Sequence, residues 1–223
     1  ETAFDDVLAE MSPGQFVQEV LVKALKAKIV VVGEGFRFGS KGSGTVETLR
    51  ELGSQLGFRV FVIPQINIGG EPVSTTRVRE LLDQGKVMAA ATLLGRNHIN
   101  TGVIEHGLKI GRTIGFPTAN MSRDCEGFLP LDGVYAGWLY ADDEKYPAAH
   151  SVGINETFQA VPRLVESFVI DAPEGLDLYG KTVTLEYVEF IRPAAKFDGV
   201  ESLVAEINRD IAKIRVALEL EEK

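Results

Sequence analysis

The chain has 223 residues, 45% of them apolar, and a formal net charge of −9. This length suffices for one large domain or two small ones, and the acidic balance argues against partners such as nucleic acid or an anionic membrane. The single cysteine, Cys125, excludes an internal disulfide and fits a reducing cytoplasm. No signal peptide is visible and no apolar run is long enough to span a bilayer, so we expect a cytoplasmic protein.

Strands and helices alternate in the first ninety residues. Helical spacing follows Ser12-Pro13 and predicts a helix that ends near Lys26. Continuous apolar runs over 27–32 and 58–63 predict buried parallel strands, with a glycine-rich loop and a helix over 45–56 between them. Another helix is expected to begin after Ser74. This alternation indicates a doubly wound α/β sheet.

Two segments of this half could bind phosphate. The first is the glycine loop Gly-x-x-Phe-Arg-Phe-Gly at 33–39, and the second is Ser-Thr-Thr-x-x-Arg at 74–79. In the second, helix N-terminal amides, hydroxyls and arginines converge on one anion; a well-capped surface helix with solvated arginines is the alternative. Together the segments resemble the adenylyltransferase module of bacterial bifunctional FAD synthetases. The resemblance implies phosphate-binding roles for Phe36, Arg37, Ser74, Thr75, Thr76 and Arg79.

The resemblance to that module is incomplete. Gly35 stands where the family commonly carries Asp or Asn, and Thr75 where Ser is common. The His-x-Gly-His motif at the front of the module is absent. We therefore expect residues 1–97 to be a partial Rossmann-like nucleotidyltransferase domain, and adenylylation of FMN only in a longer, full-length protein.

The pattern changes near residue 97, after the helix breaker Gly95-Arg-Asn. Period-two alternation with turn residues predicts antiparallel strands over 99–105, 116–121, 133–140, 146–152, 164–170 and 182–190. Six such strands would close a small barrel, which removes the sheet edges. An apolar stripe over 200–220 predicts a final helix packed on the barrel. The second domain is expected to cover residues 98–223.

Irregularly spaced glycines gather between Gly102 and Asn120. Glycines let backbone N–H groups approach an anion closely, because no Cβ stands in the way. Lys109 and Arg112 lie among them, and Thr118 follows. A hydroxyl beside a phosphate-binding loop is a usual way to hold Mg²⁺ on a nucleotide. A β-hairpin connection with turn glycines is the alternative from composition alone.

The string Gly-Arg-x-x-Gly-Phe-Pro-Thr-Ala-Asn at 111–120 resembles the signature of riboflavin kinases. Further motifs occur in the family's order: Leu-Pro-x-x-Gly-Val-Tyr-Ala at 129–136, Gly-x-Asn-x-Thr-Phe at 153–158, and the Arg163–Phe168 segment that carries the catalytic glutamate. Glu156 replaces a proline of the second motif. The resemblance implies a six-stranded antiparallel barrel and phosphorylation of riboflavin to FMN.

Roles for single residues follow from the same resemblance. Glu166 would be the catalytic base, and Arg192 would lie near the flavin. ATP would be bound by Gly107, Lys109, Gly111, Arg112, Gly115, Thr118 and Asn120, of which Thr118 and Asn120 would also hold Mg²⁺. The ligands implied are riboflavin, FMN, ATP and ADP, with FAD as the product of the full-length protein.

Two other functions remain as alternatives for the barrel. A non-catalytic flavin-sensing barrel would keep the pocket and lose Thr118, Asn120 or Glu166, yet all three are present. A nucleic-acid-binding barrel would need a basic face with stacking aromatics, which the acidic composition disfavours. The oligomeric state stays open, with a homo-oligomer as one option.

Overall fold

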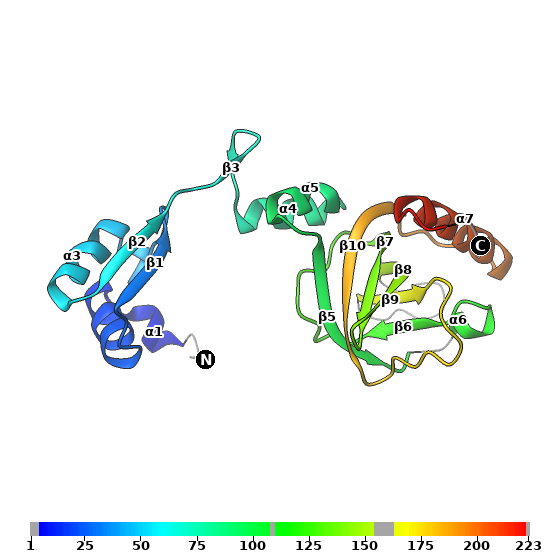
Figure 1. Cartoon of the computed structure of the whole chain (residues 1–223), viewed down its shortest axis with the longest axis horizontal. Coiled ribbons are helices and arrows are strands. Elements are labelled where there is room, and N and C mark those ends of the chain that lie inside the picture. Colours follow the sequence, from blue (N-terminus) through cyan, green and yellow to red (C-terminus); the bar gives the residue numbers. More distant parts are fainter. Residues whose placement is uncertain (1–4, 108–109, 154–162, 222–223) are drawn as a thin grey trace. The chain divides into compact units, whose positions relative to one another are not determined.

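The computed structural model describes residues 5–107, 110–153 and 163–221. The chain divides into two compact units between Val73 and Ser74. Figure 1 shows the helices and strands of each unit in the colours of the sequence.

The first unit is a helix-covered pair of parallel strands. Strand β1 (Ile29–Gly33) pairs in parallel with β2 (Arg59–Ile63), and α3 (Val46–Leu56) connects them, which confirms the predicted strand–helix–strand order. The N-terminal helix begins with the expected cap: Ser12 and Gln15 form a capping box. The remaining elements are α1 (Asp6–Glu10), α2 (Pro13–Phe16), the π-helix η1 (Val17–Ala24), the 3₁₀ turn η2 (Ser40–Gly42), β3 (Asn67–Ile68) and β4 (Glu71–Pro72).

Among the residues that the structure describes, helices cover only one face of the β1–β2 pair. Val30, Val32, Val60 and Val62 pack with Leu49 of α3 in one apolar cluster. The opposite face carries four apolar side chains that are 49–59% exposed: Ile29, Val31, Phe61 and Ile63. The prediction that these two strands are buried was therefore wrong for this face, because the described helices pack on the other face only.

The second unit begins with two short helices, α4 (Thr75–Asp83) and α5 (Val87–Leu94). Leu82, Val87 and Ala90 from these helices belong to the same buried cluster as the barrel interior. Gly95 ends α5 in the left-handed conformation that favours glycine. The domain boundary expected near residue 97 stays a prediction, because a division by packing does not locate the end of a homologous domain.

Six antiparallel strands close the barrel in the order β10-β5-β6-β9-β8-β7, which confirms the predicted architecture. Their bounds are β5 (His98–Glu105), β6 (Thr118–Met121), β7 (Gly133–Ala141), β8 (Glu144–Gly153), β9 (Leu164–Val169) and β10 (Thr182–Pro193). The short helix α6 (Ile110–Thr113) precedes β6 at one end of the barrel (Figure 1).

Residues alternate between the inside and the outside of the barrel along every strand. Tyr135, Leu139, Leu185 and Tyr187 point inward and are fully buried. The outward side chains of Val134 and Ala136 pack instead against Ile214 and Leu218, at the end of helix α7 (Val200–Ala217). The predicted final helix is thus confirmed, and it covers part of the outer surface (Figure 1).

Candidate active site

Glu166, Thr118 and Asn120 lie together on the outer face of the barrel. In the register between β6 and β9, Asn120 is directly opposite Glu166. The Thr118 hydroxyl donates a hydrogen bond to Glu166 Oε2, at 3.3 Å between the oxygens. All three side chains are partly exposed, whereas their neighbours Val165 and Met121 are buried. The strand pairing therefore unites a hydroxyl, an amide and a carboxylate from segments 48 residues apart.

The glycine segment before β6 approaches these side chains closely. A Cβ added at Gly107 would lie 2.5 Å from Asn120 Cγ, and one at Gly111 would collide with the carbonyl oxygen of Phe116. Real Cβ atoms essentially never show such distances. At Gly111 the obstacle is backbone, so this position requires glycine as the segment is folded here, whereas a Cβ at Gly107 would displace the Asn120 side chain. Gly111 also accepts a hydrogen bond from the Phe116 N–H at 2.8 Å, which closes the turn that leads into β6.

Two other predicted nucleotide ligands flank this turn. Arg112 is exposed in α6, and Gly115 follows with φ +89°, a left-handed value. Phe116 then packs edge-to-face on Phe168 of β9, with ring centroids 5.4 Å apart. This contact attaches the glycine segment to the strand that carries Glu166. Lys109, also predicted to bind ATP, lies outside the described residues.

Arg163 fixes the beginning of β9, a role that the sequence did not reveal. Its Nε pairs with Asp132 Oδ1 at 2.5 Å, and its Nη1 donates to the Leu129 carbonyl at 3.3 Å. Its Nη2 donates to the Pro130 carbonyl. A planar guanidinium with several donors suits such a multiple contact. The residues that precede β7 and the strand that carries Glu166 are thereby held together.

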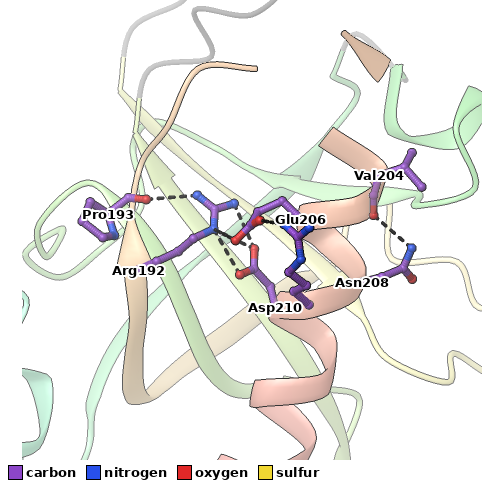
Figure 2. A network of polar contacts seen from close by, with 7 residues as sticks. Arg192, Pro193, Val204, Glu206, Asn208 and Asp210 are labelled. Atoms are coloured by element: carbon purple, nitrogen blue, oxygen red, sulfur yellow. Dashed lines mark hydrogen bonds and ion pairs between the residues drawn. The ribbon is translucent and has the colours of Figure 1, made fainter. Parts of the chain in front are cut away.

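Arg192 lies on the outer face of β10, but its guanidinium is engaged by helix α7 (Figure 2). Nε and Nη2 bond Asp210, each at 2.9 Å from Oδ2, and Glu206 Oε1 lies 3.8 Å from Nε. Nη1 donates to the Pro193 carbonyl at 3.0 Å. Burial raises the pKa of Asp210, and the bonds from Arg192 offset part of this rise. These contacts show how α7 is attached to β10, and the flavin contact expected of Arg192 stays a prediction.

Two histidines lie inside the barrel, away from the outer face. His150 Nδ1 lies 2.9 Å from Ser167 Oγ, and burial lowers the pKa of His150 to about 4. His98 Nε2 lies 2.6 Å from the Phe128 carbonyl oxygen, and burial lowers its pKa as well. Both histidines are therefore neutral in the folded protein at pH 7. Their position in the core gives both histidines a structural role in the barrel.

The residues expected to bind phosphate in the first half divide between the two units. Phe36 stacks on Phe38 in the first unit, with ring centroids 5.7 Å apart. Ser74 caps α4 in the second unit by accepting from the Arg77 N–H at 3.2 Å. Arg79 lies over the Phe128 ring, 5.8 Å from its centroid. The phosphate-binding roles of these residues, and of Arg37, Thr75 and Thr76, stay predictions.

The Thr118 hydroxyl and the Asn120 amide oxygen are of the ligand types that a magnesium ion shared with a nucleotide takes. Within the described residues, no cluster of three or more His, Cys, Asp or Glu could hold a metal by itself. Thr118 and Glu166 bring one hydroxyl and one carboxylate within 3.3 Å of each other, with the Asn120 amide beside them. Mg²⁺ commonly takes few protein oxygens and completes its shell with phosphate and water.

None of the helices in the described part of the chain has the length and apolar character to cross a bilayer.

Comparisons with known families match both halves of the chain. A family model described as riboflavin kinase matches residues 94–218, and one described as FAD synthetase matches residues 1–77. The first match includes Thr118, Asn120 and Glu166 on the outer face of the barrel. Most of α4 and all but the last residue of α5 fall between the two matches.

Individual proteins give the same result. The chain is 33% identical over 208 residues to the bifunctional riboflavin kinase/FMN adenylyltransferase of Listeria monocytogenes serovar 1/2a. The aligned region covers 93% of this chain and 65% of that protein. The protein of that name from Escherichia coli K12 is also 33% identical, with 93% and 66% covered. The chain thus spans about two thirds of the length of these relatives. A solved structure named as macrolide-efflux protein from Streptococcus pneumoniae has a TM-score of 0.79 at 33% identity, over 95% of this chain and 67% of that one.

Proposed function

The chain belongs to the riboflavin kinase family, and we propose on that premise that its barrel transfers the γ-phosphate of ATP to the 5′-hydroxyl of riboflavin. The observation that carries the proposal is the hydrogen bond from the Thr118 hydroxyl to Glu166 Oε2, at 3.3 Å, beside the glycine segment. It places a carboxylate next to the group expected to hold the nucleotide. A flavin-sensing barrel would not need this combination.

Glu166 acts as the base in the proposed reaction. Its carboxylate accepts the proton of the riboflavin 5′-hydroxyl while that oxygen bonds to the γ-phosphorus. The bond from the γ-phosphorus to the bridging oxygen breaks at the same time, and ADP leaves. A positioned base contributes roughly 10²–10⁴-fold to such a rate. Most of the remaining catalysis in phosphoryl transfer comes from positioning and from neutralising charge.

The glycine segment supplies the positioning. The ATP phosphates are placed beside Gly107, Gly111 and Gly115, where no Cβ would stand between the backbone and an anion. The Gly115 N–H donates to the Arg112 carbonyl at 3.4 Å and would have to exchange that bond to reach a phosphate. Lys109 and Arg112 offset phosphate charge. Thr118 and Asn120 are the residues that would hold Mg²⁺, which when bound to ATP neutralises charge on the β- and γ-phosphates. Arg192 is the flavin-side residue in this proposal, and binding there would require exchange of its Asp210 contact.

The direct test incubates the purified chain with riboflavin, ATP and Mg²⁺ and separates FMN from FAD by chromatography. The proposal expects FMN and ADP in equal amounts, and a stop of both when either substrate is omitted. ADP without FMN, or no turnover of riboflavin at saturating ATP, would contradict it. A chain carrying Glu166→Gln serves as the matched control for contaminating kinase activity.

A second activity belongs in the proposal for the longer protein. The match of residues 1–77 to FAD synthetase supports adenylylation of FMN to FAD by a protein that contains this unit. The proposed phosphate ligands of this activity are Phe36 and Arg37 of the first unit and Ser74, Thr75, Thr76 and Arg79 of the second. The same assay, run with the longer protein, reports this activity as FAD. A cytoplasmic location completes the proposal, since both reactions use cytoplasmic ATP and the one cysteine requires no oxidising compartment.

A further inference from the structure

Glu166 lies in a row of outward-facing residues, one from each neighbouring strand, and this row continues beyond Glu166 on the side away from Asn120. Asn120 of β6 is opposite Glu166 of β9, and Glu166 is opposite Ser151 of β8. Val134 of β7 is opposite Ser151 and is buried by α7. Glu166 therefore has one polar neighbour on each side, and only the Asn120 side has been assigned a function.

Ser151 presents a free hydroxyl at this position. Its strand neighbours His150 and Val152 are buried in the barrel, so Ser151 itself faces outward and is exposed. Its backbone pairs with β7 and β9, but its hydroxyl has no hydrogen-bond partner among the described residues. Cβ atoms of directly opposed residues in antiparallel strands lie about 5 Å apart, so its hydroxyl is within reach of a group bound at the Glu166 carboxylate.

The order of residues in this row indicates on which side of Glu166 each substrate binds. Thr118, Asn120 and the glycine segment lie on the β6 side of Glu166, where the proposed function puts the phosphates. An alcohol that attacks the γ-phosphorus approaches from the other side of the transferred group, because attacking and leaving oxygens are roughly in line. The β8 side, where Ser151 lies, is then the side of the alcohol substrate.

We propose that Ser151 binds the polyol chain of the substrate, through a hydrogen bond to the hydroxyl next to the reacting one. This inference rests on the proposed function and adds a specificity residue to it. A protein hydroxyl that pairs with a substrate hydroxyl disfavours analogues without that group, because the protein hydroxyl is then left unpaired. Ser151 would therefore select a vicinal diol next to the reacting end.

The test compares Ser151→Ala with the parent on riboflavin and on 4′-deoxyriboflavin, which lacks the neighbouring hydroxyl. We expect the substitution to raise KM for riboflavin roughly three- to tenfold, as for a neutral hydrogen bond, and to leave KM for ATP within twofold. The preference for riboflavin over the deoxy analogue should fall by the same factor. Ser151→Thr, which keeps the hydroxyl, should restore most of the affinity.

A matched control and a second readout keep the outcomes distinct. Thr182→Ala removes another exposed strand hydroxyl, on β10, and should change none of these values. Riboflavin binding is also measured by fluorescence quenching without ATP. Flavin binding that weakens in Ser151→Ala without any FMN formation by the parent would overturn the proposed kinase reaction and leave Ser151 as a flavin-binding residue. Normal FMN formation with an unchanged preference between the two flavins would overturn the inference alone.

Discussion

The hydroxyl of Thr118 is hydrogen-bonded to the carboxylate of Glu166 across two barrel strands whose register puts Asn120 directly opposite that carboxylate. Three groups of different chemistry are thus held by backbone pairing and do not depend on a loop. Groups fixed on strands keep their separations through a reaction cycle, which favours positioned proton transfer.

Replacing Glu166 by glutamine should remove the base and keep the shape of the site. We expect kcat for FMN formation to fall by roughly 10²–10⁴-fold with little change in KM for ATP. Glu105→Gln is the matched control, because Glu105 is the other strand neighbour of Asn120 and is exposed. Steady-state kinetics at saturating Mg²⁺ measure kcat and KM for each variant. A kcat of Glu166→Gln within threefold of the parent would exclude this residue as the base.

Thr118→Ala should lose a group that holds the metal–nucleotide complex. Activity at low Mg²⁺ is expected to fall roughly 10- to 100-fold, as for loss of a contact to a charged group. Excess Mg²⁺ should restore part of the rate, and Thr118→Ser should restore nearly all of it. A deficit that is the same at every Mg²⁺ concentration would argue against a metal role.

Gly111→Ala should displace the turn that leads into β6. The new Cβ would collide with the carbonyl oxygen of Phe116, and that backbone group cannot move aside without shifting Thr118. A displacement of about 1 Å at a reacting group costs on the order of 10²-fold in rate. Gly35→Ala is the control, since a Cβ there meets nothing within 4 Å. Equal kcat/KM for the two variants would disprove this account of the glycine.

The interior histidines should make the barrel sensitive to acid. The pKa of His150 is lowered from 6.5 to about 4 by burial, so between these values the unfolded chain binds a proton that the folded chain does not. The free energy of unfolding should therefore fall as pH drops from about 6.5 to 4, by about 3 kcal/mol for this residue alone. Urea titrations at several pH values measure the slope.

Two variants identify the source of that slope. His150→Asn is expected to be less stable at pH 7, because Ser167 loses its partner, and to show a flatter dependence on pH. His106→Asn alters an exposed histidine and should keep the full slope. A slope that survives in His150→Asn without change would assign the acid sensitivity to other groups, with His98 as the first of them.

Asp210→Ala should loosen helix α7 from the barrel. It removes the main partner of Arg192, whose side chain is 16% exposed. The guanidinium then keeps the Pro193 carbonyl, but the nearest carboxylate left to it is Glu206, 3.8 Å away. Removing one member of a buried pair typically costs about 3–5 kcal/mol, because the other charge stays buried. Thermal unfolding should show this loss, whereas Arg209→Ala, which removes an exposed ion pair to Glu206, should change stability by less than about 1 kcal/mol.

The sequence alone determined the order of elements and the kind of fold. Period-two alternation after residue 97 predicted six antiparallel strands, and the structure closes these six into a barrel. The motif around Thr118 and Asn120 and the segment with Glu166 were also visible in the sequence. Local patterns carry this information because strand periodicity and turn residues depend on neighbours a few positions apart.

Only the tertiary structure decided which residues lie on the same face of the barrel and which are opposite one another on neighbouring strands. The β8–β9 register puts Ser151 beside Glu166, 15 positions away in the sequence, and the packing of α7 engages Arg192 with Asp210. Closure of the barrel also buries His150 against the Tyr187 ring. Such relations depend on strand register and helix docking, and a slip of one residue would turn every side chain to the other face.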